Sequence, residues 1–228
     1  MIEFLLIDLD DTILDFHKAE EIALSKTLSA FGIEPTEPVC ARYSQINKEH
    51  WERLERKELT RQQVVVGRFD QLFREVGVSG DSERCAAMYA DHLSEGHYFL
   101  PGAEETLNIL AKKYRLFLAS NGNAAVQERR LKSAAISHYF EKIFISQQLG
   151  ADKPSPDFFQ AAFSQIPGFQ KERAMIVGDS LTSDIQGGNN AGITTCWVNP
   201  KHLPRREDIR VDYEIEALHQ LPALLEAL

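Results

Sequence analysis

Cysteine is scarce in this 228-residue sequence, and the three that occur, Cys40, Cys85 and Cys196, lie far apart with no CxxC pair among them. The seven histidines form no HExxH or similar metal-binding spacing. A scattered, odd number of cysteines is typical of reduced thiols in the cytosol. These absences exclude a disulfide scaffold and lead us to expect a cytoplasmic location.

Long apolar runs and excess positive charge are also missing. No stretch approaches the ~20 apolar residues that cross a bilayer, and the apolar start of the chain meets Asp8 too early for a signal sequence. The sequence has 25 basic and 34 acidic residues, a net charge of −9. We therefore expect no membrane and no nucleic acid polymer as partner, and a small anionic ligand only where positive charge gathers locally. The sequence leaves monomer and homodimer equally open.

Patterns of buried strands alternate with helical patterns over most of the chain. The strands are predicted at 4–9, 115–119, 142–146, 174–178 and 194–198. Helices are predicted at 103–113, 123–136, 156–166 and 183–191, with a closing amphipathic segment at 214–227. Such alternation predicts βαβ units and an α/β fold with a doubly wound, Rossmann-like parallel sheet.

Residues 15–97 interrupt this alternation with three or four helical patterns and no strand. The sequence therefore predicts two domains. One is an α/β core formed by residues 1–14 plus 98–228, and the other is an all-helical domain of residues 15–97 inserted after the first strand.

Carboxylates follow two of the predicted strands, at the sheet edge where ligands of open parallel sheets bind. Asp8 and Asp10 end the first strand, and Asp179 and Asp184 follow the fourth in the run GDSLTSD. An isolated DxD is more often a solvated acidic turn, and Asp184 could serve a helix N-terminus. Together, however, these oxygen ligands suit Mg²⁺, which takes one or two carboxylates, waters and a substrate phosphate.

Hydrogen-bond donors follow the second and third predicted strands, at the same edge of the sheet. Ser120, Asn121 and Gly122 can form an anion cradle, although serine and asparagine are also ordinary helix caps. Lys153 precedes Pro154, which favours an extended backbone and directs the lysine along the strand end. Each of these features has an ordinary explanation when it occurs alone. Their occurrence together, at successive strand ends, predicts a phosphate site beside a metal site.

These four segments, DLDDT at 8–12, SNG at 120–122, Lys153-Pro154 and GDSLTSD at 178–184, resemble the four motifs of the haloacid dehalogenase (HAD) superfamily. The resemblance spans essentially the whole chain, and the helical insert is similar to that family's C1 cap. Within the superfamily, the chain resembles bacterial pyrimidine nucleoside 5′-monophosphatases, in the run DDTILDFHKAE, in the insert and in GDSLTSDIQGGNNAGI.

The resemblance implies a hydrolase that transfers a phosphoryl group to Asp8, with Asp10 as acid and then base. It implies Mg²⁺ held by Asp8, the Asp10 carbonyl and Asp179, with support from Asp184. It also implies a phosphoryl group gripped by Ser120 and Asn121 and balanced by Lys153. The implied substrate is a small phosphorylated metabolite, a nucleoside monophosphate.

The nominated substrate contacts are Phe16, Asn47, Trp51 and Arg68, for which packing, or a surface ion pair at Arg68, is the ordinary alternative. A sugar-phosphate phosphatase or phosphosugar mutase on the same scaffold stays open as an alternative. A phosphoacceptor signalling module fits less well, because such domains are about half this length and lack a helical insert. Dehalogenase activity is disfavoured by Asp10, which the namesake enzymes lack.

Overall fold

The structure, a computed structural model, describes all residues from 1 to 228 and divides them into two compact units. One unit is formed by residues 1–16 and 97–228, and the other by residues 17–96. The chain passes from the first unit to the second two residues later than the sequence pattern predicts. It returns one residue earlier than predicted.

The first unit, called the core unit below, is built on a six-stranded sheet with the order β3-β2-β1-β4-β5-β6. All neighbouring strands are parallel. The strands are β1 (Phe4–Ile7), β2 (Arg115–Ser120), β3 (Lys142–Ile145), β4 (Ala174–Gly178), β5 (Thr194–Val198) and β6 (Tyr213–Ile215). The predicted doubly wound parallel sheet is confirmed.

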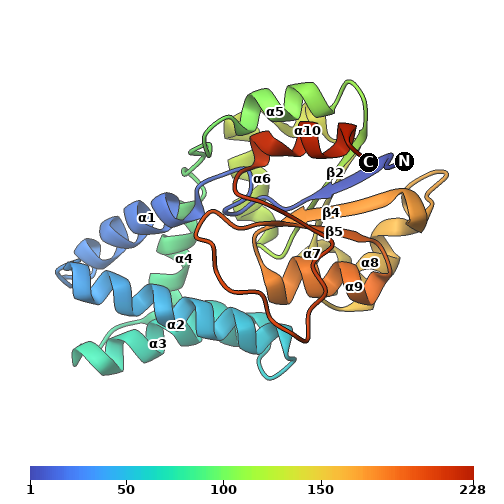
Figure 1. The fold of residues 1–228 in the computed structure, drawn as a ribbon. Coiled ribbons are helices and arrows are strands. Elements are labelled where there is room, and N and C mark those ends of the chain that lie inside the picture. The colour runs from blue at the N-terminus through green and yellow to red at the C-terminus, as the bar shows by residue number, and fades with distance from the viewer. The chain divides into compact units, whose positions relative to one another are not determined.

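Helices cover both faces of this sheet (Figure 1). They are α5 (Ala103–Leu110), α6 (Ala124–Ala134), α7 (Ser146–Leu149), α8 (Pro156–Phe163), α9 (Gln186–Ala191) and α10 (Leu221–Glu226), with short turns η1 (Ser137–Tyr139), η2 (Lys171–Arg173), η3 (Leu181–Ile185) and η4 (Leu218–Gln220). Along β1, Leu5 and Ile7 pack toward α5, α6 and α10, whereas Phe4 and Leu6 pack toward α8 and α9. A strand buried on both faces explains the unbroken apolar run in the sequence.

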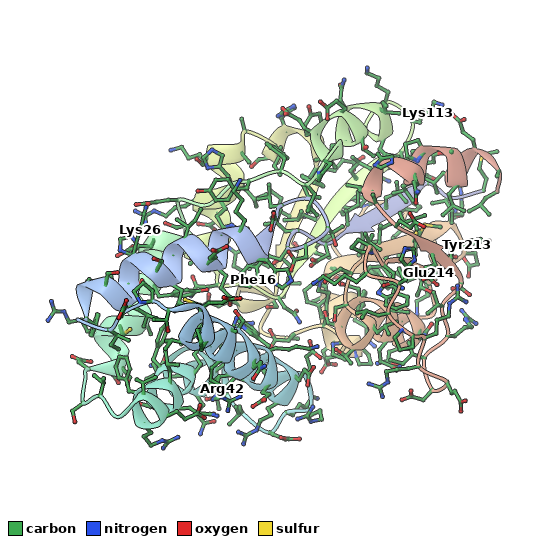
Figure 2. The ribbon with its side chains drawn as sticks, turned by 60° about the vertical axis from the view of Figure 1, so that its left-hand side comes forward. Phe16, Lys26, Arg42, Lys113, Tyr213 and Glu214 are labelled. Atoms are coloured by element: carbon green, nitrogen blue, oxygen red, sulfur yellow. The ribbon has the colours of Figure 1, made fainter.

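The C-terminal segment differs from its prediction as one amphipathic element over 214–227. It holds the edge strand β6, marked in Figure 2 by Tyr213 and Glu214, and then η4 and α10. Residues 213–215 pair in parallel with residues 196–198 of β5. A three-residue strand is too short for its alternation to stand out from a helical pattern, so only sheet pairing identifies it.

The second unit, called the helical unit below, contains α1 (Phe16–Ala30) apart from its first residue, α2 (Glu37–Glu55), α3 (Arg61–Val76) and α4 (Ser82–Leu93). The rings of Tyr43, Phe69 and Tyr89 meet at its centre, 5.1–5.6 Å between centroids. Outside, Lys26 bonds Glu95 and Arg42 bonds Glu75; Figure 2 labels the two basic residues. No helix in either unit is both long enough and apolar enough to span a bilayer.

Candidate active site

The strand order places a binding crevice at the carboxyl ends of β1 and β4. From β1 the chain goes on to β2 on one side, and from β4 it goes on to β5 on the other, so the connections diverge between these two neighbouring strands. Such a switch point leaves a crevice beyond the strand ends, where ligands of open α/β sheets bind. Asp8 directly follows β1, and Asp179 directly follows β4.

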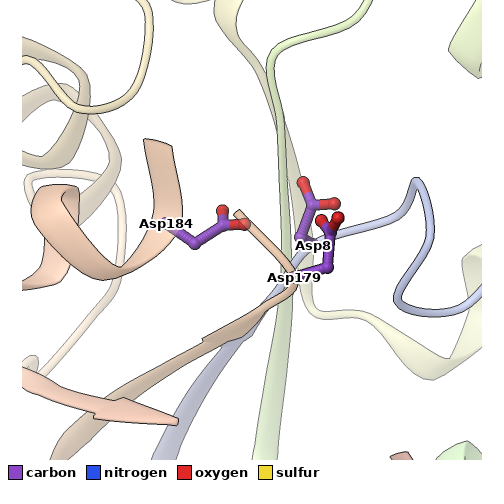
Figure 3. A group of neighbouring side chains, drawn as sticks. All are labelled: Asp8, Asp179 and Asp184. Atoms are coloured by element: carbon purple, nitrogen blue, oxygen red, sulfur yellow. The ribbon is translucent and has the colours of Figure 1, made fainter. Parts of the chain in front are cut away.

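Three carboxylates meet at this crevice. Asp8, Asp179 and Asp184 each place a carboxylate oxygen within 4.8 Å of the other two (Figure 3). Asp184 reaches the cluster from the η3 turn because β4 ends in Gly178. A Cβ at that position would lie only 2.2 Å from Asp184 Oδ2, so a larger residue would push the carboxylate away.

Lys153 is the cation of this cluster, and its side chain is 1% exposed. Its Nζ donates to Asp8 Oδ1, Asp184 Oδ1 and the Ala119 carbonyl, each at 2.6 Å. The three donors of the ammonium are thereby all used. The α8 helix that follows begins at residue 156, as predicted, with Ser155 as its N-cap.

The electrostatics of the cluster are dominated by desolvation. Burial raises the pKa of Asp8 to about 8, opposed by Lys153 and reinforced by Asp184 and Asp10. Burial also raises the pKa of Asp179, with Asp184, Asp8 and Asp11 adding to the shift. For Lys153, burial lowers the pKa, but the charges of Asp184 and Asp8 overcome this effect and raise it above its ordinary value. The lysine therefore stays charged, as one cation among the three carboxylates of Asp8, Asp179 and Asp184.

The side chains of Ser120 and Asn121, at the end of β2, have different hydrogen-bond partners. The Ser120 hydroxyl accepts a hydrogen bond from Gly122 N at 3.1 Å and one from Gln127 Nε2 at 2.9 Å. The Asn121 side chain instead bonds the backbone of Lys153 twice, donating to its carbonyl and accepting from its N–H, both at 2.8 Å. Asn121 thus fixes the segment that carries the lysine, and the α6 cap is Asn123 rather than either residue.

Asp10 has two partners that sequence reasoning missed, Gln127 and Arg130. Gln127 Nε2 donates to Asp10 Oδ2 at 2.6 Å, and Arg130 forms an ion pair with Asp10 Oδ1. Both partners are buried on α6. The available signal was a polar pair three residues apart on the helix face that also carries Val126 and Leu131.

The profile of the haloacid dehalogenase-like hydrolase family matches residues 5–198. This range contains every strand-end group described above. The chain belongs to this family.

Relatives match this HAD hydrolase over nearly its whole length. It is 40% identical to pyrimidine 5′-nucleotidase PynA of Streptococcus pneumoniae, over 96% of this chain and 93% of that protein. It is 28% identical to pyrimidine 5′-nucleotidase YjjG of Escherichia coli, over 98% and 97% of the two chains. A crystal structure of Bacillus subtilis YfnB bound to magnesium superposes with a TM-score of 0.94 at 38% identity, covering 98% of each chain.

The donor set of this HAD hydrolase fits a hard divalent cation. All clustered side-chain ligand atoms of Asp8, Asp179 and Asp184 are carboxylate oxygens, and the cluster contains neither histidine nor cysteine. Oxygen-only sites of this kind suit Mg²⁺. The side chain of Asp10 lies outside the cluster, so only its backbone carbonyl stays a candidate ligand.

The four nominated substrate contacts fall into two groups. Asn47 and Arg68 are buried in the helical unit, where Arg68 donates to Asn47 Oδ1 and Asn47 donates to Glu20 Oε1, both at 2.7 Å. The alternative given for Arg68, a surface ion pair, does not fit either, because its guanidinium is buried against aromatic rings inside the unit. The polar groups of Asn47 and Arg68 are thus used in hydrogen bonds within the helical unit.

Phe16 and Trp51 are half-buried. Phe16 N donates to Asp11 Oδ1 at 2.9 Å at the start of α1. The guanidinium of Arg61 lies 5.5 Å from the centre of the Trp51 ring. Both residues stay candidates for substrate contact.

Stability should depend jointly on pH and Mg²⁺. Because the pKa of Asp8 rises from 3.8 to about 8 on folding without metal, the folded protein holds a proton that the unfolded chain releases between these values. Stability of the metal-free protein should therefore fall as pH rises through this window. Mg²⁺ needs the ionised carboxylate, so its stabilising effect should be larger at about pH 9 than at about pH 5.

Thermal unfolding in Mg²⁺ and in EDTA, from about pH 5 to about pH 9, measures how stability and its increase by Mg²⁺ depend on pH. In Asp8→Asn the part of the pH dependence due to Asp8 should vanish, along with most of the Mg²⁺ effect. An increase in unfolding temperature on adding Mg²⁺ that does not change with pH would contradict the prediction.

Proposed function

We propose that this HAD hydrolase is a Mg²⁺-dependent phosphomonoesterase that works through an aspartyl phosphate on Asp8. The observation that carries the proposal is the position of Asp8 at the β1–β4 switch point, 2.6 Å from Lys153 and two residues before a second carboxylate. Covalent catalysis divides a slow hydrolysis into two easier displacements. The three free cysteines accord with the proposed cytoplasmic location.

In the first displacement, a carboxylate oxygen of Asp8 attacks phosphorus in line with the ester oxygen. An O–P bond forms on Asp8, the ester P–O bond breaks, and Asp10 gives its proton to the leaving oxygen. Asp10 has the exposure for this exchange, since its side chain is 29% exposed whereas Lys153 is 1% exposed. Lys153, with the Ser120 hydroxyl and the Asn121 N–H, offsets negative charge on the phosphoryl oxygens.

In the second displacement, Asp10 takes a proton from water as the water oxygen bonds to phosphorus. The Asp8 O–P bond breaks, which frees phosphate and restores the Asp8 carboxylate. Asp8, Asp179, Asp184 and the Asp10 carbonyl would hold Mg²⁺. When bound, this ion supplies Lewis-acid polarisation and neutralises charge on the phosphoryl group.

We propose pyrimidine nucleoside 5′-monophosphates as the substrates. Support comes from PynA and YjjG, both named pyrimidine 5′-nucleotidases and both aligned along nearly the whole chain. The helical unit, as an inserted cap, is the proposed source of substrate selectivity, with Phe16 and Trp51 as candidate contacts for base or sugar.

A substrate panel tests this proposal. Phosphate release should be fastest with uridine and thymidine monophosphates, slower with purine nucleotides and sugar phosphates, and abolished by EDTA. Restoring Mg²⁺ should restore activity. Undiminished turnover in excess chelator would overturn the metal requirement, and a clear preference for a sugar phosphate would overturn the substrate class.

A further inference from the structure

Gln127 and Arg130 join the proposed acid–base residue to the proposed phosphate-binding residue. Gln127 Nε2 donates to both Asp10 Oδ2 at 2.6 Å and Ser120 Oγ at 2.9 Å. Arg130 pairs with the other carboxylate oxygen of Asp10 and also donates to Gln127 Oε1, at 2.9 Å. The four side chains thus form one connected hydrogen-bonded group.

Burial shows that this group is built into the fold. Arg130 is 0% exposed and Gln127 is 2% exposed. A buried guanidinium is costly unless it is paired, so its position depends strongly on Asp10. Both side chains come from one face of α6, the helix whose Leu131 and Ala134 pack into the core of the unit. Asp10 is thereby tied to a fixed helix at both carboxylate oxygens.

Gly122 supplies the space that Gln127 occupies. A Cβ on Gly122 would lie 2.4 Å from Gln127 Nε2 and 2.6 Å from its Cγ and Cδ. The three obstructed atoms all belong to the Gln127 side chain, so alanine at this position should displace Gln127. Gly122 does not lie in the left-handed region of backbone conformation, which makes the steric effect separable from strain.

We propose that Gln127 and Arg130 are positioning residues that hold the Asp10 carboxyl group in line with the leaving oxygen of a phosphoryl group bound at Ser120. The inference rests on the proposed phosphatase function and deepens it. A displacement of a reacting group by about 1 Å can cost about 100-fold in rate, so loss of either partner should be visible in the step that needs Asp10 as an acid.

The leaving group provides the test. A nucleoside leaves as an alkoxide that needs a proton, whereas p-nitrophenolate is stable without one. In a two-step reaction, kcat/KM reports only events up to the first irreversible displacement, so the later water attack does not enter. The experiment is therefore to measure kcat/KM for uridine monophosphate and for p-nitrophenyl phosphate in Arg130→Met and Gln127→Met, both with Mg²⁺.

The expected result is a loss of ~10–100-fold for the nucleotide and of less than ~3-fold for the aryl ester, because only the first reaction draws on general acid catalysis. The control is Arg129→Met, an exposed neighbour on the same helix, which should change neither value. Equal losses on both esters, or no loss on either, would overturn the inference. A wild-type protein inactive on both would overturn the proposed function, and this inference with it.

Gly122→Ala gives a second route that keeps both positioning residues and decides the matter if Arg130→Met fails to fold. It should reproduce the loss seen for Gln127→Met on the nucleotide. The double variant Gly122→Ala with Gln127→Met should lose no more than either single variant, because both act through the same contact. Additive losses would show that Gly122 acts independently of Gln127 and would overturn this part of the inference.

Discussion

Asp8→Asn is expected to lower kcat by at least ~10⁴-fold, since removing a covalent nucleophile removes the whole two-step route. The amide has nearly the shape of the carboxylate and can still accept from Lys153, so the fold should persist. In EDTA near neutral pH the variant should be at least as stable as the wild type, because one carboxylate is lost from a site where burial raises the pKa of Asp8 to about 8.

Rapid-quench analysis tests this prediction directly, because it measures the amount of phosphoenzyme that forms. Wild-type protein mixed with labelled nucleotide should show a phosphoenzyme, and Asp8→Asn should show none. Asp70→Asn serves as the matched control, because Asp70 is an exposed carboxylate on α3 and its loss should leave turnover unchanged. Retention of more than about a hundredth of wild-type turnover in Asp8→Asn would contradict a covalent role for Asp8.

Lys153→Met is expected to impair both stability and catalysis. The side chains of Asp8 and Asp184, 10% and 1% exposed, would lose the cation that bonds both of them. Breaking a buried pair by removing one partner costs about 3–5 kcal/mol, and we expect a loss of this size in EDTA. Turnover with Mg²⁺ should fall by about 10²–10³-fold, as when a fixed donor to developing charge is removed.

Urea unfolding in EDTA and in Mg²⁺ separates these two effects. Mg²⁺ should recover part of the lost stability, because it replaces positive charge among the carboxylates, but it should not recover turnover. The double variant Lys153→Met with Asp184→Asn should be more stable in EDTA than Lys153→Met alone. Lys142→Met, at an exposed lysine on β3, is the control. A stability loss below about 1 kcal/mol in EDTA would show that the carboxylates do not depend on Lys153.

The sequence predicted the parts of the molecule that depend on local pattern. Buried strands produce unbroken apolar runs, and their alternation with helices implies parallel order, so the groups at strand ends could be expected at one edge before any contact was known. That reasoning brought together Asp8, Ser120, Lys153 and Asp179. It failed for β6, which has only three residues and is defined by pairing with β5.

The sequence by itself therefore determined the doubly wound sheet, the inserted helical unit and the strand-end positions of the candidate catalytic groups. Only the tertiary structure decided which side chains hold those groups in place. Gln127 and Arg130 reach Asp10 across 117 and 120 residues of chain, and Asn121 reaches Lys153 across 32. Such partners depend on how a helix or loop docks against the sheet, and a periodic pattern records that a face is buried but not what it meets.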